Sequence, residues 1–241
     1  MIGRFNFWFE DAVTLRIDNI AKEIKELKEK IQDIEQEINE HKENSMDFDE
    51  NGRPSESYLD LFSELGGLHY EIDFLSEQRL SIEEMKLVCL YKNFEILMKE
   101  IIISSFPDAD VDKLFKWDNL KTFFKSYGML IGDIKNHNLI DQLRVVNNNI
   151  KHSNIIDEKV ERANIVEFEY KDKYDCECLS EFYDRVRNEP IKFLEYLAKK
   201  IIEYLFVFDE ERIDKIASQY GGRMGKETAI KFAEALIKKC T

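Results

Sequence analysis

Four polar side chains between residues 144 and 152 have the chemistry needed to move protons beside a negatively charged group. They are Arg144, Asn148, Lys151 and His152. A histidine exchanges a proton near neutral pH, and arginine and lysine supply positive charge to an anionic oxygen. The amide of Asn148 can orient either the histidine or the anion. These residue types are able to carry out acid–base chemistry beside an anionic group.

The same four residues fall on one side of a helix predicted over 139–153. With successive residues placed about 100° apart, the apolar residues of the segment gather on the opposite side. These apolar residues are Leu139, Leu143, Val146 and Ile150. We therefore expect the apolar side to pack in a helical bundle and the polar stripe to face outward or into a cleft.

Three consecutive asparagines, Asn147 to Asn149, lie inside this predicted helix. Asparagine is a poor helix former, so helix propensity does not explain a run of three. We interpret Asn148 as a catalytic residue and expect Asn147 and Asn149 to bind substrate.

The segment Asn148 to His152 (NNIKH) resembles the Asn-x-x-Lys-His motif of defence-associated members of the HEPN superfamily. The elements around it follow a similar order: a long apolar helix, a short segment at Trp117 to Leu120, the motif helix and a closing apolar helix. The resemblance implies a HEPN-like helical bundle over 83–208, which is about half of the chain.

The resemblance also implies a function, namely metal-independent cleavage of RNA by its own 2′-OH. His152 would transfer protons, Arg144 and Lys151 would stabilise the charged transition state, and Asn148 would orient the histidine or the phosphate through its amide. Such sites are composite across a two-fold homodimer and leave a 2′,3′-cyclic phosphate and a 5′-OH. The expected role is that of a toxin or anti-phage effector acting on tRNA or mRNA, held in check by an antitoxin or regulatory protein. No cofactor and no metal is expected.

Two other functional classes remain open, because the usual HEPN arginine directly precedes the asparagine and Asn147 stands there instead. Arg144 lies about one helical turn earlier. A non-catalytic HEPN protein that binds RNA, nucleotide or a protein partner is the first alternative. A coiled-coil scaffold that only dimerises is the second. Lys151 and His152 are also suited to a helix C-terminus, where cations complement the helix dipole.

The N-terminal third predicts an antiparallel coiled-coil hairpin over 1–82, which we call the arm. Apolar residues recur at alternating steps of three and four, which is the coiled-coil pattern. They are Ile17, Ile20, Ile24, Leu27, Ile31, Ile34 and Ile38, and then Leu61, Leu65, Leu68, Ile72 and Leu75. A loop at Ser45 to Arg53 separates the two helices, and Pro54 and Ser55 suit the start of the second. Gly66 and Gly67 are interpreted as a close approach of the two helices or as a bend, and the close approach is the favoured interpretation.

The remaining segments complete an all-α prediction. A helix apolar on most sides ends at Pro107, and Asp118 to Tyr127 forms a short helix. Residues 165–170 alternate apolar and charged residues, which fits a short strand or an extended loop. Ile191 to Phe208 closes the bundle, and residues 209–241 form a helical tail.

The composition excludes several classes of protein. Only 9 Gly and 3 Pro in 241 residues disfavour a sandwich or barrel, and a net charge of −14 argues against a broad basic nucleic-acid surface. No run of about 20 apolar residues and no signal region is present, so we expect a cytoplasmic protein without a membrane span. Zinc-ligand spacing is also missing from the four cysteines, which are Cys89, Cys176, Cys178 and Cys240.

Overall fold

The structure, a computed structural model, describes the backbone of residues 3–43 and 53–240. Side chains are described from residue 11 onward within these ranges, except at 43, 111, 115 and 240. The described part of the chain is about 81% helix and contains no strand; Ile155 and Lys173 form an isolated antiparallel bridge. The all-α prediction is confirmed. Most of the loop predicted at Ser45 to Arg53 lies outside the described residues.

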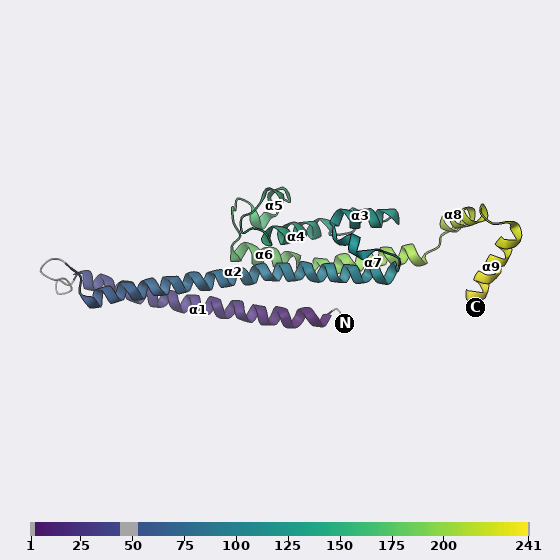
Figure 1. The fold of residues 1–241 in the computed structure, drawn as a ribbon. Coiled ribbons are helices and arrows are strands. Elements are labelled where there is room, and N and C mark those ends of the chain that lie inside the picture. Colours follow the sequence, from purple (N-terminus) through teal and green to yellow (C-terminus); the bar gives the residue numbers. More distant parts are fainter. Residues whose placement is uncertain (1–2, 44–52, 241) are drawn as a thin grey trace. The chain divides into compact units, whose positions relative to one another are not determined.

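The chain divides into two compact units (Figure 1). Unit 1 comprises Met1–Met98 and Asn136–Lys192, and unit 2 comprises Lys99–Lys135 and Phe193–Thr241. Two helices pass from one unit into the other along the chain: α2 (Glu56–Ser105) and α7 (Glu189–Phe206). The predicted boundary of the arm at residue 82 therefore falls inside a continuous helix, because no residue near it, such as a proline, interrupts the helical hydrogen bonds.

The arm consists of α1 (Gly3–Glu43) and the part of α2 up to residue 82. The Arg16 guanidinium donates to Gln78 Oε1 at 3.2 Å, and Ile38, further along α1, packs with Tyr58 near the start of α2, so the helices run antiparallel. Two buried clusters hold them together: Ile20, Leu27 and Leu75, and then Ile34, Ile38 and Tyr58. At the start of α2 the Tyr58 amide donates to Ser55 Oγ at 3.2 Å, so Ser55 caps the helix as predicted.

The two glycines of the arm do not mark a close approach of helices. A Cβ placed on Gly66 or Gly67 would meet no atom within 4 Å, and both residues lie inside α2. The expected packing role is therefore wrong within the described part of the chain. Their effect is confined to the helix itself, where glycine carries an entropic cost.

Substituting either glycine by alanine should stabilise the protein by about 0.5–1 kcal/mol, because the helix loses an entropic cost and gains no clash. Urea denaturation measures the change. Gly128→Ala is the matched control: Gly128 has φ +74°, so alanine should destabilise there. If alanine at both Gly66 and Gly67 lowered the free energy of unfolding, the substitutions would be disturbing a contact other than those described here.

The rest of unit 1 is built around α4 (His137–Ile150) and α6 (Cys176–Val186), with the short helices α5 (Glu158–Arg162) and η4 (Val166–Phe168) beside them. The segment predicted as a strand or extended loop at 165–170 thus contains a 3₁₀ turn. It is anchored by Phe168, whose ring lies 5.2 Å from those of Tyr174 and Phe182.

One polar network ties these elements of unit 1 together. The Arg185 guanidinium donates from Nε and Nη2 to both carboxylate oxygens of Glu167, at 2.5 and 2.8 Å, and from Nη1 to Gln142 Oε1 at 3.0 Å. Gln142 in turn donates to the Ala163 carbonyl at 3.0 Å. Glu167 has a side chain only 8% exposed, and its pKa is lowered because the hydrogen bonds from Arg185 and from its own backbone outweigh burial. The network fixes α4 against α6.

Unit 2 contains the last turns of α2, η2 (Val111–Phe115), α3 (Trp117–Ser126), η3 (Ile131–Asp133) and most of α7, followed by α8 (Glu210–Gly221) and α9 (Lys226–Cys240). Rings from three segments form its aromatic core, with centroids 4.5 to 6.5 Å apart: Phe106, Phe123, Phe124, Tyr127 and Tyr204. Within 3–43 and 53–240, no helix combines the length and apolar character needed to cross a bilayer.

Candidate functional site

The motif helix α4 is fixed at its N-terminus by Asn136 and Glu189. Asn136 has the left-handed backbone conformation (φ 67°), and its side-chain amide donates to the Glu189 carboxylate. Glu189 is 8% exposed, and its other oxygen accepts from Lys192 Nζ at 2.7 Å. A hydrogen bond across 53 residues thus holds the start of α4 and the start of α7 together within unit 1.

The C-terminal end of α4 places His152 immediately beyond the helix. The last helical residue is Ile150, and the backbone amides of His152 and Ser153 both donate to the Asn149 carbonyl at 2.9 Å. Lys151 and His152 form the turn that follows, and both side chains are exposed. The helix is therefore slightly shorter than predicted, as is common at frayed helix ends.

The three asparagines have different surroundings. Asn147 is 0% exposed and Asn149 is 6% exposed, whereas Asn148 is exposed. Asn149 Oδ1 accepts a hydrogen bond from the Tyr174 hydroxyl at 2.6 Å, and Asn147 Nδ2 donates to Asn148 Oδ1 at 3.3 Å. Asn147 Oδ1 is buried and has no hydrogen-bond partner among the described residues. We predicted that Asn147 and Asn149 bind substrate, but both side chains are buried in the described structure.

The helical periodicity contained a signal for this burial. Asn147 and Asn149 lie about 80° to either side of the centre of the apolar face, whereas Asn148 lies opposite it. Polar residues at such flanking angles are covered when neighbouring elements extend over the edges of the face. Asn149 therefore has a structural role, because its amide satisfies a buried hydroxyl.

Arg144 lies apart from the exposed end of α4. Its guanidinium donates from Nε and Nη2 to Asp141 Oδ1 at 3.0 and 2.9 Å, and its side chain is 26% exposed. The Arg144–Asp141 pair also acts on Tyr91 of α2. Burial and the negative charges of Glu95 and Asp141 raise the pKa of Tyr91, and the positive charge of Arg144 lowers it. Arg144 lies six helical positions before Ile150, the last residue of α4, which is about 9 Å along the axis, and His152 lies two residues further. Asn148, Lys151 and His152 are thus exposed at the C-terminal end of α4, whereas Arg144 is paired with Asp141.

Tyr174, which no motif in the sequence marks, contacts the C-terminal part of α4 through its hydrogen bond to Asn149. It is 5% exposed, and its pKa is raised by burial and by the negative charge of Asp157, Cys178 and Glu84. Burial also raises the pKa of Glu84. Tyr174 lies 25 residues from Asn149 in the chain, so no local pattern could reveal the pair.

Tyr174→Phe should destabilise the protein by about 1–2 kcal/mol, because the oxygen of buried Asn149 loses its donor. The change in the free energy of unfolding is measured by urea denaturation. Tyr170→Phe is the control, since Tyr170 is fully exposed, and we expect an effect below about 0.5 kcal/mol there. Equal effects of the two substitutions would contradict a structural role for the Tyr174 hydroxyl.

Comparison of the chain with protein-family models, with curated proteins and with solved structures gives no match. The site is therefore interpreted from its own residues. Among the described residues, no group of three or more His, Cys, Asp or Glu side chains is placed to hold a metal ion.

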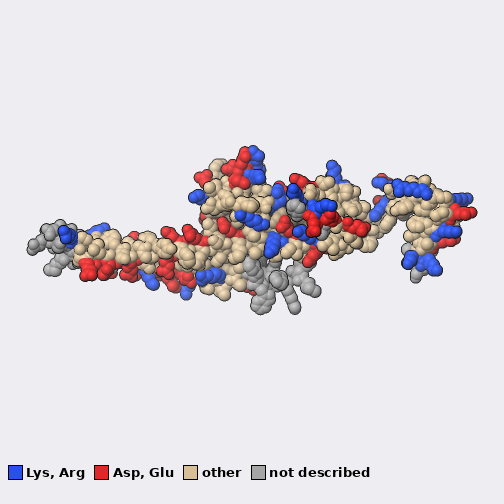
Figure 2. All heavy atoms as spheres, viewed as in Figure 1, with Lys and Arg blue, Asp and Glu red and all other residues tan. Residues whose placement is uncertain are grey.

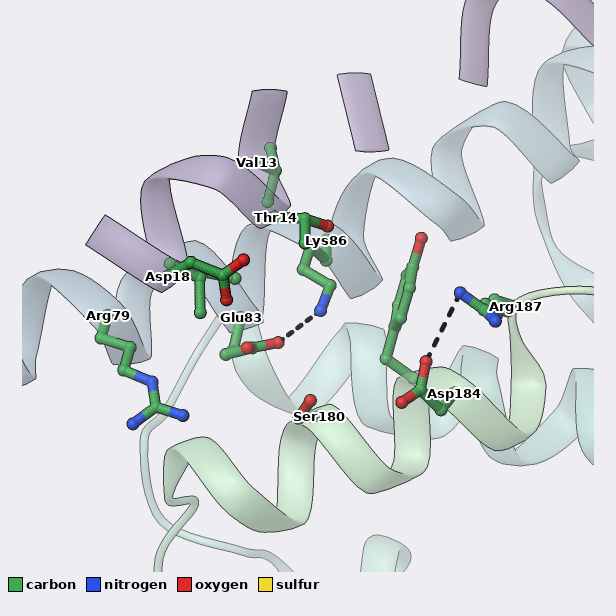
Figure 3. Close-up of a pocket in the computed structure, with 11 residues that line it drawn as sticks. Val13, Thr14, Asp18, Arg79, Glu83, Lys86, Ser180, Asp184 and Arg187 are labelled. Atoms are coloured by element: carbon green, nitrogen blue, oxygen red, sulfur yellow. Dashed lines mark hydrogen bonds and ion pairs between the residues drawn. The ribbon is translucent and has the colours of Figure 1, made fainter. Parts of the chain in front are cut away.

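A pocket of about 330 Å³ lies elsewhere in unit 1, between α1, α2 and α6 (Figure 3). Its charges are largely paired: Lys86 Nζ lies 2.7 Å from Glu83 Oε2 and Arg187 Nη1 lies 3.6 Å from Asp184 Oδ1. Glu83 is 1% exposed, and Arg79 has a buried Nε without a hydrogen-bond partner among the described residues. None of the residues predicted for catalysis lines this pocket, so the two features are separate.

Proposed function

We propose that the chain is a metal-independent endoribonuclease of the HEPN type. The observation that supports this most directly is that Asn148, Lys151 and His152 are all exposed at the C-terminal end of a helix whose apolar side is buried. The face seen in Figure 2 favours a local site over a broad one, because Lys and Arg side chains are interspersed with Asp and Glu there.

The proposed reaction is attack of an RNA 2′-OH on the adjacent phosphate. His152 of one copy removes the proton from the 2′-OH, and His152 of a second copy protonates the departing 5′ oxygen. Lys151 stabilises the negative charge that develops on the phosphate oxygens, and Asn148 donates an amide hydrogen bond to them. The bond to the 5′ oxygen breaks as the bond to the 2′ oxygen forms, which leaves a 2′,3′-cyclic phosphate and a 5′-OH. A homodimer is required, since a single histidine cannot serve both steps at once.

The cellular role that goes with this activity is that of a toxin or anti-phage effector in the cytoplasm. Its substrate would be tRNA or mRNA, and an antitoxin or regulatory protein would hold it inactive. This part of the proposal rests on the resemblance of the Asn148 to His152 motif and of the order of helices around it.

A non-catalytic RNA-binding role is the second candidate, and the position of Arg144 favours it. Asp141 accepts two hydrogen bonds from the Arg144 guanidinium, which neutralises the cation that would otherwise contact a phosphate. Lys151 would then bind RNA without enough transition-state stabilisation for cleavage.

The test is incubation of the purified protein with total RNA and with tRNA in excess EDTA, followed by mapping of the cleaved ends. Cleavage that leaves cyclic-phosphate ends supports the ribonuclease. RNA binding without cleavage, measured by fluorescence anisotropy, supports the second candidate. If the folded protein neither binds nor cuts RNA, both proposals are wrong.

A further inference from the structure

The second helix of the arm has an apolar stripe on the side that faces away from α1. Four large side chains form this outer stripe, and they are between 42% and 75% exposed: Leu59, Phe62, Tyr70 and Phe74. They fall within about 120° of one another around the helix, and their centre lies about 150° from that of the side that packs on α1. The packed side contains Tyr58, Leu61, Leu65, Leu68 and Leu75. This part of α2 is therefore apolar on two sides, and within the described part of unit 1 only one of them packs on another helix.

Gly66 leaves a gap in the middle of the outer stripe. It lies about one helical turn from both Phe62 and Tyr70, and a Cβ placed on it would meet no atom within 4 Å. A gap between side chains at helical spacing can accept a ridge of side chains from another helix. The exposed parts of the three aromatic side chains amount to roughly 300 Å², a size at which apolar patches are often functional. The outer stripe thus has the form of a helix-docking surface.

The half of the arm that carries the outer stripe is strongly acidic. Residues 56–78 of α2 contain six Asp and Glu and no Lys or Arg, and residues 31–41 of α1, which pack on them, contain four and none. We call these two segments the acidic half of the arm, and Figure 2 shows Asp and Glu side chains gathered along the arm. Four of the carboxylates lie along one edge of the outer stripe at helical spacing: Glu56, Asp60, Glu64 and Glu71.

We propose that the acidic half of the arm binds a basic amphipathic helix of another protein. The apolar side of that helix packs on the outer stripe, and its Lys and Arg side chains lie beside the carboxylates. Amphipathic helices bind to apolar grooves through side chains at spacings of three and four, and complementary charges select the partner. The proposal is independent of RNA cleavage, because the arm contains none of the residues assigned to the reaction.

The charge of the acidic half disfavours other classes of partner. A nucleic acid or an anionic membrane would bring phosphate groups against ten carboxylates in segments without Lys or Arg. A second copy docked through the same surface would double the negative charge at the contact. A cationic partner instead gains from every carboxylate that it approaches.

The first test measures binding of a synthetic helical peptide to the full chain by fluorescence anisotropy. The peptide has about 20 residues, with leucine at helical spacing on one side and lysine elsewhere. Tyr70→Ser should raise its Kd about tenfold, because the most exposed ring of the outer stripe is lost. Tyr170→Ser is the matched control, since Tyr170 is also exposed and lies outside the arm, and it should leave the Kd unchanged.

A scrambled peptide of the same composition, without a single apolar side, separates docking from general attraction between charges. It should bind at least about tenfold more weakly than the ordered peptide, because it cannot cover the outer stripe. Far-UV circular dichroism checks that both tyrosine variants keep their helix content.

The second test reverses the charge of the surface. Glu64→Lys with Glu71→Lys should weaken binding of the lysine peptide and strengthen binding of its counterpart with glutamate in place of lysine. Glu227→Lys with Glu234→Lys is the control, because these two residues are also exposed and seven positions apart but lie in α9. We expect the control to change neither affinity by more than about twofold.

Several results would overturn the proposal. They are a wild type that shows no saturable binding of the lysine peptide, equal binding of the ordered and scrambled peptides, and the same Kd for Tyr70→Ser and Tyr170→Ser. Loss of self-association in Tyr70→Ser, measured by sedimentation equilibrium, would assign the outer stripe to a second copy instead. Weaker RNA binding by Tyr70→Ser would likewise assign it to a nucleic acid.

Discussion

His152→Ala should lower the rate of RNA cleavage by about 100-fold or more, because general acid–base catalysis typically contributes about 10²–10⁴ and His152 would serve in both proton transfers. His152 is exposed and lies just beyond the last residue of α4, so its removal should leave the fold intact. Cleavage of a labelled RNA in excess EDTA measures the effect. The affinity for RNA should change little, since Lys151 and Asn148 remain.

His69→Ala is the matched control for this substitution. His69 is also exposed, but it lies on the arm within α2, far along the chain from the motif. We expect its cleavage rate to equal that of the wild type. A His152→Ala variant that cuts RNA as fast as the wild type would exclude His152 as the catalytic acid or base and would trace any nuclease activity to another site or to a contaminant.

Arg185→Met should lower the free energy of unfolding by about 2–3 kcal/mol. This is the largest change that we expect from the loss of one partly exposed side chain. The substitution leaves Glu167, with its side chain only 8% exposed, without the two hydrogen bonds that neutralise its charge. It also removes the hydrogen bond to Gln142 that joins α6 to α4. Urea denaturation near pH 7 measures the loss.

This stabilisation should depend on pH in a defined direction. The folded pKa of Glu167 is lowered, so the ionised form is favoured by folding and its contribution is full above the unfolded pKa of about 4.3. The contribution is lost as the pH falls through the folded pKa. The difference in stability between the wild type and Arg185→Met should therefore shrink between pH 7 and about pH 3.

Arg187→Met is the control, because Arg187 is two residues further along the chain and its side chain forms an exposed ion pair with Asp184 at 3.6 Å. We expect it to change stability by less than about 0.5 kcal/mol. The double variant Arg185→Met with Glu167→Leu should recover part of the loss, since it removes the unpaired carboxylate as well. Equal losses from Arg185→Met and Arg187→Met would show that the Glu167 contact contributes little.

Much of the secondary structure was predictable because its causes are local. The apolar spacing of the arm predicted two antiparallel helices, and Ser55 predicted where the second begins. The opposed faces of the motif segment predicted a helix with Asn148, Lys151 and His152 on its polar side, and the structure leaves these three exposed. Each of these features depends on residues within a few turns of one another.

The tertiary structure alone decided which polar residues of α4 are accessible. From the sequence, all three asparagines were expected to act at the site. In the structure Asn149 is buried and accepts a hydrogen bond from Tyr174, 25 residues away, and Asn147 is fully buried. The pairing of Arg185 with Glu167 and Gln142 spans 18 and 43 residues, and nothing in local spacing predicts it. The physical reason is that helical periodicity determines which side of a helix is apolar, whereas the burial of residues at the edges of that side depends on which other segments pack against it.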